Sequence, residues 1–248
     1  MRVRPRSETA DRCGVALGVR VAKTSAPNVR GCSLEPGMQL ISLPVSPFAA
    51  RVRIAIYAKG LPIELVPPPA GWPQNPQFRD VSPTGRIPVL LDERGAIWES
   101  AVLLEFLEER FPETPPLLPP EVYDRARARL LMRHVDLYLM PAMVALAQPR
   151  TDVAGPRRAL DELVNGITML DGLLGGPQYA VGGRLSLADC ALAPALFAAR
   201  VTGRRLGMDL IEVAPAVADY AQFAPQDPHV ARVLREMEDG LRLLVRSG

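Results

Sequence analysis

The sequence of 248 residues contains only three cysteines and two histidines. Cys13 and Cys32 lie near the N-terminus and Cys190 is the only cysteine in the rest of the chain. His134 and His229 are isolated. This spacing excludes a disulfide framework and a cysteine–histidine metal site, so we expect no metal. The low cysteine content also predicts a reducing compartment, the cytoplasm.

Uninterrupted apolar runs are also short, and none is long enough to span a bilayer. Hydrophobic residues make up 48% of the chain and charged residues 23%, which is ordinary for a globular protein. The formal charge of +2 arises in residues 1–37, which carry seven Lys or Arg against three Asp or Glu, so the remainder is slightly acidic. No basic patch with interleaved aromatic residues occurs. We therefore expect no membrane and no nucleic-acid partner.

Residues 1–37 form a basic extension that has neither a hydrophobic core nor the apolar region of a signal peptide. We predict that this extension is disordered. Met38 directly precedes the first strand-like run, so an upstream start or an added extension explains its origin. An Arg-rich targeting arm is the functional alternative.

Short alternating elements follow in residues 38–112. Hydrophobic periodicity and turn residues predict strands at 38–44, 63–66, 88–91 and 96–98 and helices at 47–59, 76–81 and 101–110. A small four-stranded sheet with helices on its faces accommodates this order. The Pro- and Gly-rich stretch 67–76 predicts an irregular loop.

The second half of the chain is predicted to be entirely helical. Five prolines within residues 111–120 make a stiff connector, which places a linker at 113–120 and a second domain at 121–248. Helices are predicted at 121–148, 156–175, 186–201, 215–223 and 229–246. Ser186 and Asp189 form a capping box at the start of one of them, which favours a structural role, with Cys190 as a buried packing residue.

Ser46 is the most informative single residue because it places a hydroxyl where a helix begins. Pro47 suits the first helical turn and Gly60 ends the periodic run. Free backbone N–H groups and the helix dipole stabilise an anion at such a position. We hypothesise that this anion is a thiolate.

Two further motifs point to peptide recognition. Pro88 directly precedes a predicted strand, and a cis Ile87–Pro88 bond would turn the Ile87 backbone outward for pairing, whereas a plain turn is the simpler alternative. Ser100 is a natural N-cap for the next helix. Together with Glu99, it could also hold the carboxylate and ammonium of an amino-acid head group.

These motifs together resemble the cytosolic glutathione S-transferases. The resemblance spans residues 38–246 and rests on Ser-Pro-Phe-Ala-x-Arg at 46–51, Gly-Arg-Ile-Pro-Val-Leu at 85–90, Glu-Ser at 99–100, the Pro-rich linker and Leu-Ser-Leu-Ala-Asp at 185–189. It implies an α/β plus all-α architecture, in which a thioredoxin-like glutathione-binding domain at 38–112 precedes an all-helical C-terminal domain. It also implies glutathione as co-substrate, a homodimer and a role in detoxification.

The resemblance assigns roles to individual residues. Ser46 would hydrogen-bond the glutathione sulfur, Ile87 beside Pro88 would pair with the cysteinyl backbone, and Phe48 would belong to the same site. Glu99 and Ser100 would hold the γ-glutamyl end. The glycine carboxylate would meet Arg86 or, as further candidates, Trp72 or Gln74. The pocket for the electrophile would take its side chains from Tyr123, Arg127 and Tyr138.

Ser46 departs from the most similar motif, that of the omega-type enzymes, which have cysteine there. Serine cannot form a mixed disulfide, so we favour attack of the glutathione sulfur on an electrophilic carbon over disulfide reduction. A glutathione-dependent isomerase of a small unsaturated diacid shares the same site, and Arg127 or Arg133 would give it a basic pocket. A non-catalytic binding or regulatory protein is the third possibility.

Overall fold

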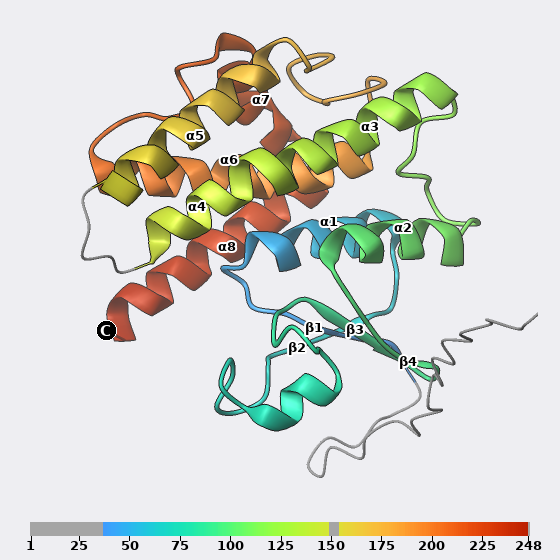
Figure 1. Ribbon diagram of the computed structural model, residues 1–248. Helices are drawn as coiled ribbons and strands as arrows, with labels where there is room; N and C mark the ends of the chain where they lie inside the picture. The colour runs from blue at the N-terminus through green and yellow to red at the C-terminus, as the bar shows by residue number, and fades with distance from the viewer. Residues whose placement is uncertain (1–36, 149–153, 248) are drawn as a thin grey trace, which may run out of the picture.

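The computed structural model describes residues 37–148 and 154–247. The basic extension predicted to be disordered falls almost wholly on residues 1–36, outside the described residues. Figure 1 shows two layers, a small sheet with its helices and a larger bundle of helices packed on it.

The first half contains a four-stranded sheet in the order β2-β1-β3-β4. Strand β1 runs parallel to β2 and antiparallel to β3, and β3 is antiparallel to β4. The elements are β1 (Gln39–Ile41), α1 (Pro47–Lys59), β2 (Glu64–Val66), the 3₁₀ helix η1 (Pro76–Asp80), β3 (Val89–Asp92), β4 (Gly95–Trp98) and α2 (Ser100–Arg110). The predicted order is confirmed, with β1 shorter than expected.

Helix α1 begins and ends where its capping residues dictate. The Oγ of Ser46 accepts a hydrogen bond of 3.2 Å from the amide of Ala49, and Pro47 occupies the first turn. Gly60 ends the helix with a left-handed backbone (φ 64°), and its N–H donates to the carbonyls of Ile56 and Tyr57. The predicted bounds of 47–59 are confirmed.

The second half is helical throughout its described residues. Its elements are α3 (Val122–His134), the π-helical turn η2 (Val135–Leu139), α4 (Met140–Ala147), α5 (Ala154–Asp171), α6 (Leu187–Leu206), α7 (Pro215–Phe223), the 3₁₀ helix η3 (Ala224–Gln226) and α8 (Pro228–Ser247). The single helix expected at 121–148 is interrupted by the π turn. With this correction, the predicted architecture of a thioredoxin-like half and an all-helical half is confirmed.

The continuous path Val122–Ala147 is long and apolar enough to cross a membrane by length and composition alone. The sequence analysis did not anticipate this, because charged residues interrupt the apolar runs within residues 122–147. Leu131, Val135 and Leu139 on this path are buried in the protein core. A buried core helix passes the same test, so the path carries no argument for a membrane.

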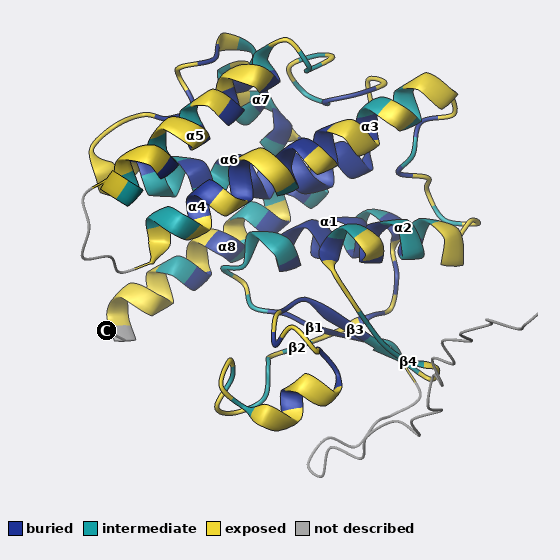
Figure 2. Cartoon of the chain, in the orientation of Figure 1, coloured by how far each residue is buried: buried dark blue, intermediate teal, exposed yellow. Residues whose placement is uncertain are grey.

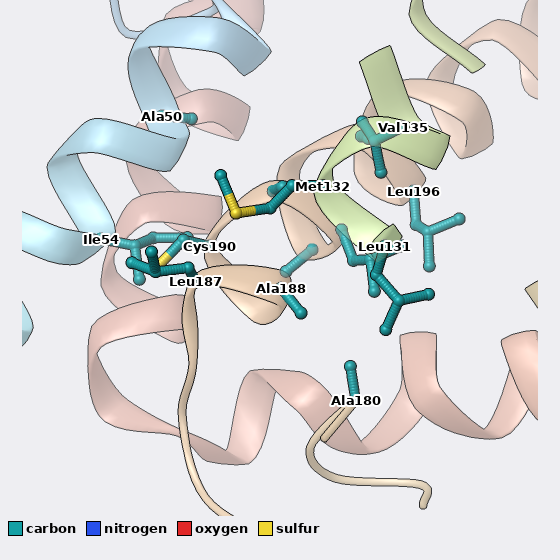
Figure 3. Close-up of a cluster of buried hydrophobic side chains, with 14 of the residues drawn as sticks. Ala50, Ile54, Leu131, Met132, Val135, Ala180, Leu187, Ala188, Cys190 and Leu196 are labelled. Atoms are coloured by element: carbon teal, nitrogen blue, oxygen red, sulfur yellow. The ribbon is translucent and has the colours of Figure 1, made fainter. Parts of the chain in front are cut away.

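The two halves share one hydrophobic core, centred where α1 packs against α6. In Figure 3 Ile54 of α1 lies with Leu187 and Cys190 of α6, and Met132 of α3 approaches from the other side. Figure 2 shows α1 and α6 as largely buried elements between exposed outer helices. The geometry of α1 is therefore fixed by both halves.

The capping box at the start of α6 is present as predicted. The Asp189 carboxylate is buried and accepts hydrogen bonds from the Ser186 amide and hydroxyl, the Ala180 amide and the Tyr220 hydroxyl. Burial nevertheless raises the pKa of Asp189 to about 6, because these donors only partly offset the loss of water. Cys190 is a free, buried thiol whose pKa burial raises, and its predicted packing role is confirmed.

Candidate functional site

A cavity of about 450 Å³ lies between the two halves, and its volume is typical of small-molecule sites. One wall comes from the first half and consists of Phe48, Arg86, Glu99, Ser100 and Ala101. The opposite wall comes from α3, η2, α4 and the residue after α4, and consists of Arg133, Asp136, Met140, Pro141, Val144, Ala145 and Gln148. The structure thus brings together four of the residues expected in the glutathione site: Phe48, Arg86, Glu99 and Ser100.

Ser46 is half-buried at the N-terminus of α1 and is not among the residues that line the cavity. Its Oγ accepts from Ala49, so its O–H remains available as a donor. Over the described ranges, no acceptor is hydrogen-bonded to this O–H or to the amide N–H of Phe48. Two donors, the Ser46 O–H and the Phe48 N–H, therefore lie two residues apart at the positive end of α1.

The Ile87–Pro88 peptide bond is cis, as hypothesised. Both residues are buried at the start of β3 and do not line the cavity. The preceding turn is held by Ser82, whose hydroxyl donates to the carbonyl of Arg86 and accepts from its amide, at 2.8 and 3.1 Å. This turn fixes the backbone of Arg86, while its side chain is exposed at the cavity.

The prediction that Ser100 caps α2 is wrong. Glu99 is the N-cap, with a left-handed backbone (φ 70°), and Ser100 is the first helical residue. A left-handed conformation costs a residue other than glycine about 1–3 kcal/mol and is concentrated at functional sites. This backbone turns Glu99 to the surface and buries Ser100, and both line the cavity.

The structure does not bring the candidates for the electrophile pocket to the cavity. Tyr123 is 78% exposed and Tyr138 is 50% exposed, and neither lines it. Arg127 donates to the carbonyl of Leu173 at 3.1 Å, also outside it. Nor do Trp72 and Gln74 line it, and the Trp72 indole donates to the carbonyl of Gly85.

The second wall contains residues that the sequence analysis missed. Asp136 is one of them, and it accepts a 2.8 Å hydrogen bond from the guanidinium of Arg51, which is 1% exposed. Arg133, named only as a possible basic group, lies one turn before it and lines the cavity. The apolar run in α4 was the available signal, because Met140 and Val144 are spaced for one helix face.

Helix α8 packs against the segment that leads to Ser46. The guanidinium of buried Arg53 donates to the carbonyl of Pro44 at 2.7 Å and to Glu236 of α8 at 3.0 Å. The hydroxyl of Tyr57 also donates to Glu236. Burial lowers the pKa of Arg53, whereas burial and the bond to Glu236 raise the pKa of Tyr57.

Among the described residues, no group of three or more His, Cys, Asp or Glu is placed to hold a metal ion. The polar side chains that line the cavity instead carry guanidinium, carboxylate, hydroxyl and amide groups. These are groups that recognise a zwitterionic organic molecule.

Comparison with known proteins gives a consistent result. Models of the N-terminal and C-terminal domains of glutathione S-transferases match residues 40–115 and 120–223. A glutathione S-transferase of Pseudomonas putida is 29% identical over 220 residues, covering 85% of this chain and 99% of that protein. A stringent starvation protein A homolog of Coxiella burnetii is 31% identical over 160 residues, covering 64% and 75%. The crystal structure of rice GST1 in complex with glutathione has a TM-score of 0.69, 29% identity, and coverage of 87% of this chain and 100% of that one.

Proposed function

The chain belongs to the glutathione S-transferase family, and from this premise we propose that it is a transferase in which the hydroxyl of Ser46 activates the thiol of glutathione. The thiolate then attacks an electrophilic carbon of a small molecule. The observation that supports this proposal most directly is the pair of donors at the N-terminus of α1, the O–H of Ser46 and the N–H of Phe48.

These donors favour a thiolate for a simple physical reason. A free thiol has a pKa near 8.5, whereas thiols at helix N-termini have pKa values of about 3.5 to 7.5. A fall of two units corresponds to about 2.7 kcal/mol of preference for the thiolate. The hydroxyl that caps α1 is itself held by Ala49, so little reorganisation is required when the sulfur binds.

The proposed reaction forms a carbon–sulfur bond. The thiol proton leaves to solvent, and the thiolate supplies the electron pair. In a substitution the leaving group departs with its own electron pair; in an addition to a conjugated carbonyl, the displaced pair moves toward oxygen and the product takes up a proton. The cavity contributes by holding both reactants in proximity.

The rest of glutathione is assigned to the first wall. We propose that Glu99 binds the γ-glutamyl ammonium, Ser100 its carboxylate, and Arg86 the glycine carboxylate. The backbone of Ile87, beside the cis bond to Pro88, would pair with the cysteinyl unit. The cavity lining of Arg86, Glu99 and Ser100 supports this arrangement, as does the complex of the rice relative with glutathione.

Ultraviolet titration of bound glutathione tests the mechanism. We expect the bound thiol of the wild type to have a pKa about two units below the free value. In Ser46→Ala, the pKa of the bound thiol should lie most of the way back toward the free value. Ser46→Thr is the matched control because it keeps a hydroxyl that caps a helix. A wild-type thiol that titrates near its free value would exclude this role for Ser46.

Two alternatives remain, each with its own supporting observation. A glutathione-dependent isomerase of an unsaturated diacid would use the same site, and Arg133 in the cavity lining favours an acidic substrate. A binding or regulatory protein is supported by the similarity to the stringent starvation protein homolog. Such a protein need not lower the pKa of glutathione, so the same titration separates it from the enzyme.

We also propose that the protein is a cytoplasmic homodimer. Its one cysteine within the described residues is a buried free thiol, which suits a reducing compartment. Exposed apolar side chains on α2, α3 and η2, namely Val102, Leu130 and Leu137, are candidates for the dimer interface. Sedimentation tests the oligomeric state directly, and a monomer at micromolar concentration would contradict it.

A further inference from the structure

Two arginines face the same cavity from opposite sides without a charged partner. Arg86 lies on the wall of the first half and Arg133 on α3. In the part of the chain that the structure describes, neither guanidinium has a hydrogen bond or an ion pair. Arginine presents a planar set of donors that matches a carboxylate in two parallel hydrogen bonds.

The other charged groups of the lining are accounted for. Asp136 is paired with Arg51 at 2.8 Å, so its charge is neutralised from within the protein. Glu99 and Arg86 are matched by the ammonium and a carboxylate of glutathione in the proposed function. Arg133 is then the charged lining group that glutathione leaves unmatched.

The surroundings of Arg133 indicate what kind of molecule would match it. Two to three turns further along the same helical path, Met140, Pro141 and Val144 supply apolar lining. A ligand on this wall would therefore combine an apolar body with one anionic end. A carboxylate carries a single negative charge and so matches a single guanidinium, whereas a phosphate monoester carries more charge than Arg133 can balance.

We propose that the second substrate is an electrophile with a carboxylate group, and that Arg133 binds that carboxylate. This inference rests on the proposed function, because it assigns Glu99 and Arg86 to glutathione. It makes Arg133 the residue that determines specificity on the second wall.

Two glutathione conjugates of equal chain length test the proposal, S-hexylglutathione and S-(5-carboxypentyl)glutathione. Isothermal calorimetry with the full chain should give the wild type at least tenfold higher affinity for the carboxylate-bearing conjugate. Arg133→Met should abolish this preference while leaving the affinity for glutathione and for S-hexylglutathione within about twofold. Arg133→Lys should keep part of the preference, since it keeps the charge.

Arg129→Met is the matched control. It removes an arginine one turn earlier on the same helix, where the side chain is bound to Glu105 outside the cavity, and it should leave the preference intact. Equal affinity of the wild type for both conjugates would overturn the inference. An equal loss of affinity for all three ligands in Arg133→Met would also overturn it, because Arg133 would then bind the glutathione part that the three ligands share. No binding of glutathione to the wild type would overturn the proposed function and this inference with it.

Discussion

The guanidinium of Arg51 donates a 2.8 Å hydrogen bond to the carboxylate of Asp136 and thereby joins α1 to the π-helical turn η2. Arg51 is buried, and its Nε and second terminal nitrogen have no hydrogen-bond partner within the described residues. The pair lies directly behind the cavity, because Asp136 lines it and the Arg51 guanidinium lies 5.4 Å from the ring centre of Phe48, which also lines it. One buried charge thus couples the two walls of the site.

Asp136→Asn should destabilise the protein by about 3 kcal/mol, because it leaves the buried charge of Arg51 without a counterion. Combining it with Arg51→Met removes that charge, so the double variant should be more stable than Asp136→Asn alone. Denaturant unfolding of the two single variants and the double variant measures this coupling. Additive losses would show that the two side chains do not depend on each other.

The buried carboxylate of Asp189 should make stability depend on pH. Its native pKa of about 6 lies above the value of an unfolded aspartate, so the native state binds the proton more tightly. The contribution of protonated Asp189 to the free energy of unfolding is therefore fully present below about pH 4. This contribution, about 3 kcal/mol, is lost as the pH rises through about 6. The difference in unfolding free energy between the wild type and Asp189→Asn should follow this curve.

Tyr220→Phe provides the control for that titration. It keeps the carboxylate of Asp189 but removes the hydrogen bond of 3.0 Å from the Tyr220 hydroxyl. Because that bond favours the charged form, its loss should move the pH-dependent window upward. If Tyr220→Phe loses stability over the same pH range as the wild type, a group other than Asp189 is responsible for the pH dependence.

Local chemistry made much of the fold predictable. Ser46, Pro47 and Gly60 determine where α1 begins and ends, and the capping box of Ser186 and Asp189 determines where α6 begins. These signals act within one helical turn, so the sequence alone contains them. The N-cap of α2 could not be predicted from the residue types, because Glu99 adopts a left-handed backbone that glutamate rarely adopts.

The second wall of the cavity could not be predicted because tertiary packing decides which face of a long helix turns inward. Tyr138 lies inside the π turn, which inserts an extra residue and rotates everything that follows relative to an uninterrupted helix. Arg133, Met140 and Val144 share one helix face by their spacing and line the cavity. The helical period alone does not indicate that this face, rather than the face of Tyr123 and Arg127, meets the first half of the chain.

Ser46→Cys should acquire thiol–disulfide exchange that the wild type lacks. A cysteine at this helix N-terminus would be a thiolate at neutral pH, and it would attack one sulfur of a glutathione mixed disulfide and release the other as a thiol. Turnover with a small mixed disulfide, with glutathione as the reductant, measures this gain. Exchange already present in the wild type would show that serine has not removed this chemistry.

The close approach of α8 to the segment before Ser46 yields a test of whether that helix positions the hydroxyl. A Cβ on Gly240 would lie 2.9 Å from both Pro44 Cβ and Val45 Cγ1, so Gly240→Ala must displace either α8 or this segment. We expect a loss of about 1–3 kcal/mol of stability, as for other overpacked sites. Because Pro44 lies two residues before Ser46, we also expect weaker glutathione binding and a smaller shift of the bound thiol pKa.

Gly172→Ala is the matched control for Gly240→Ala, since a Cβ there meets nothing within 4 Å. It should change neither stability nor glutathione binding appreciably. Denaturant unfolding, calorimetry and thiol titration on the two variants separate packing from positioning. If Gly240→Ala loses stability but binds and ionises glutathione like the wild type, α8 only packs against the segment. If the thiol pKa moves toward its free value, the contact of Gly240 with Pro44 and Val45 sets the position of the Ser46 hydroxyl, because neither residue itself contributes a donor to the sulfur.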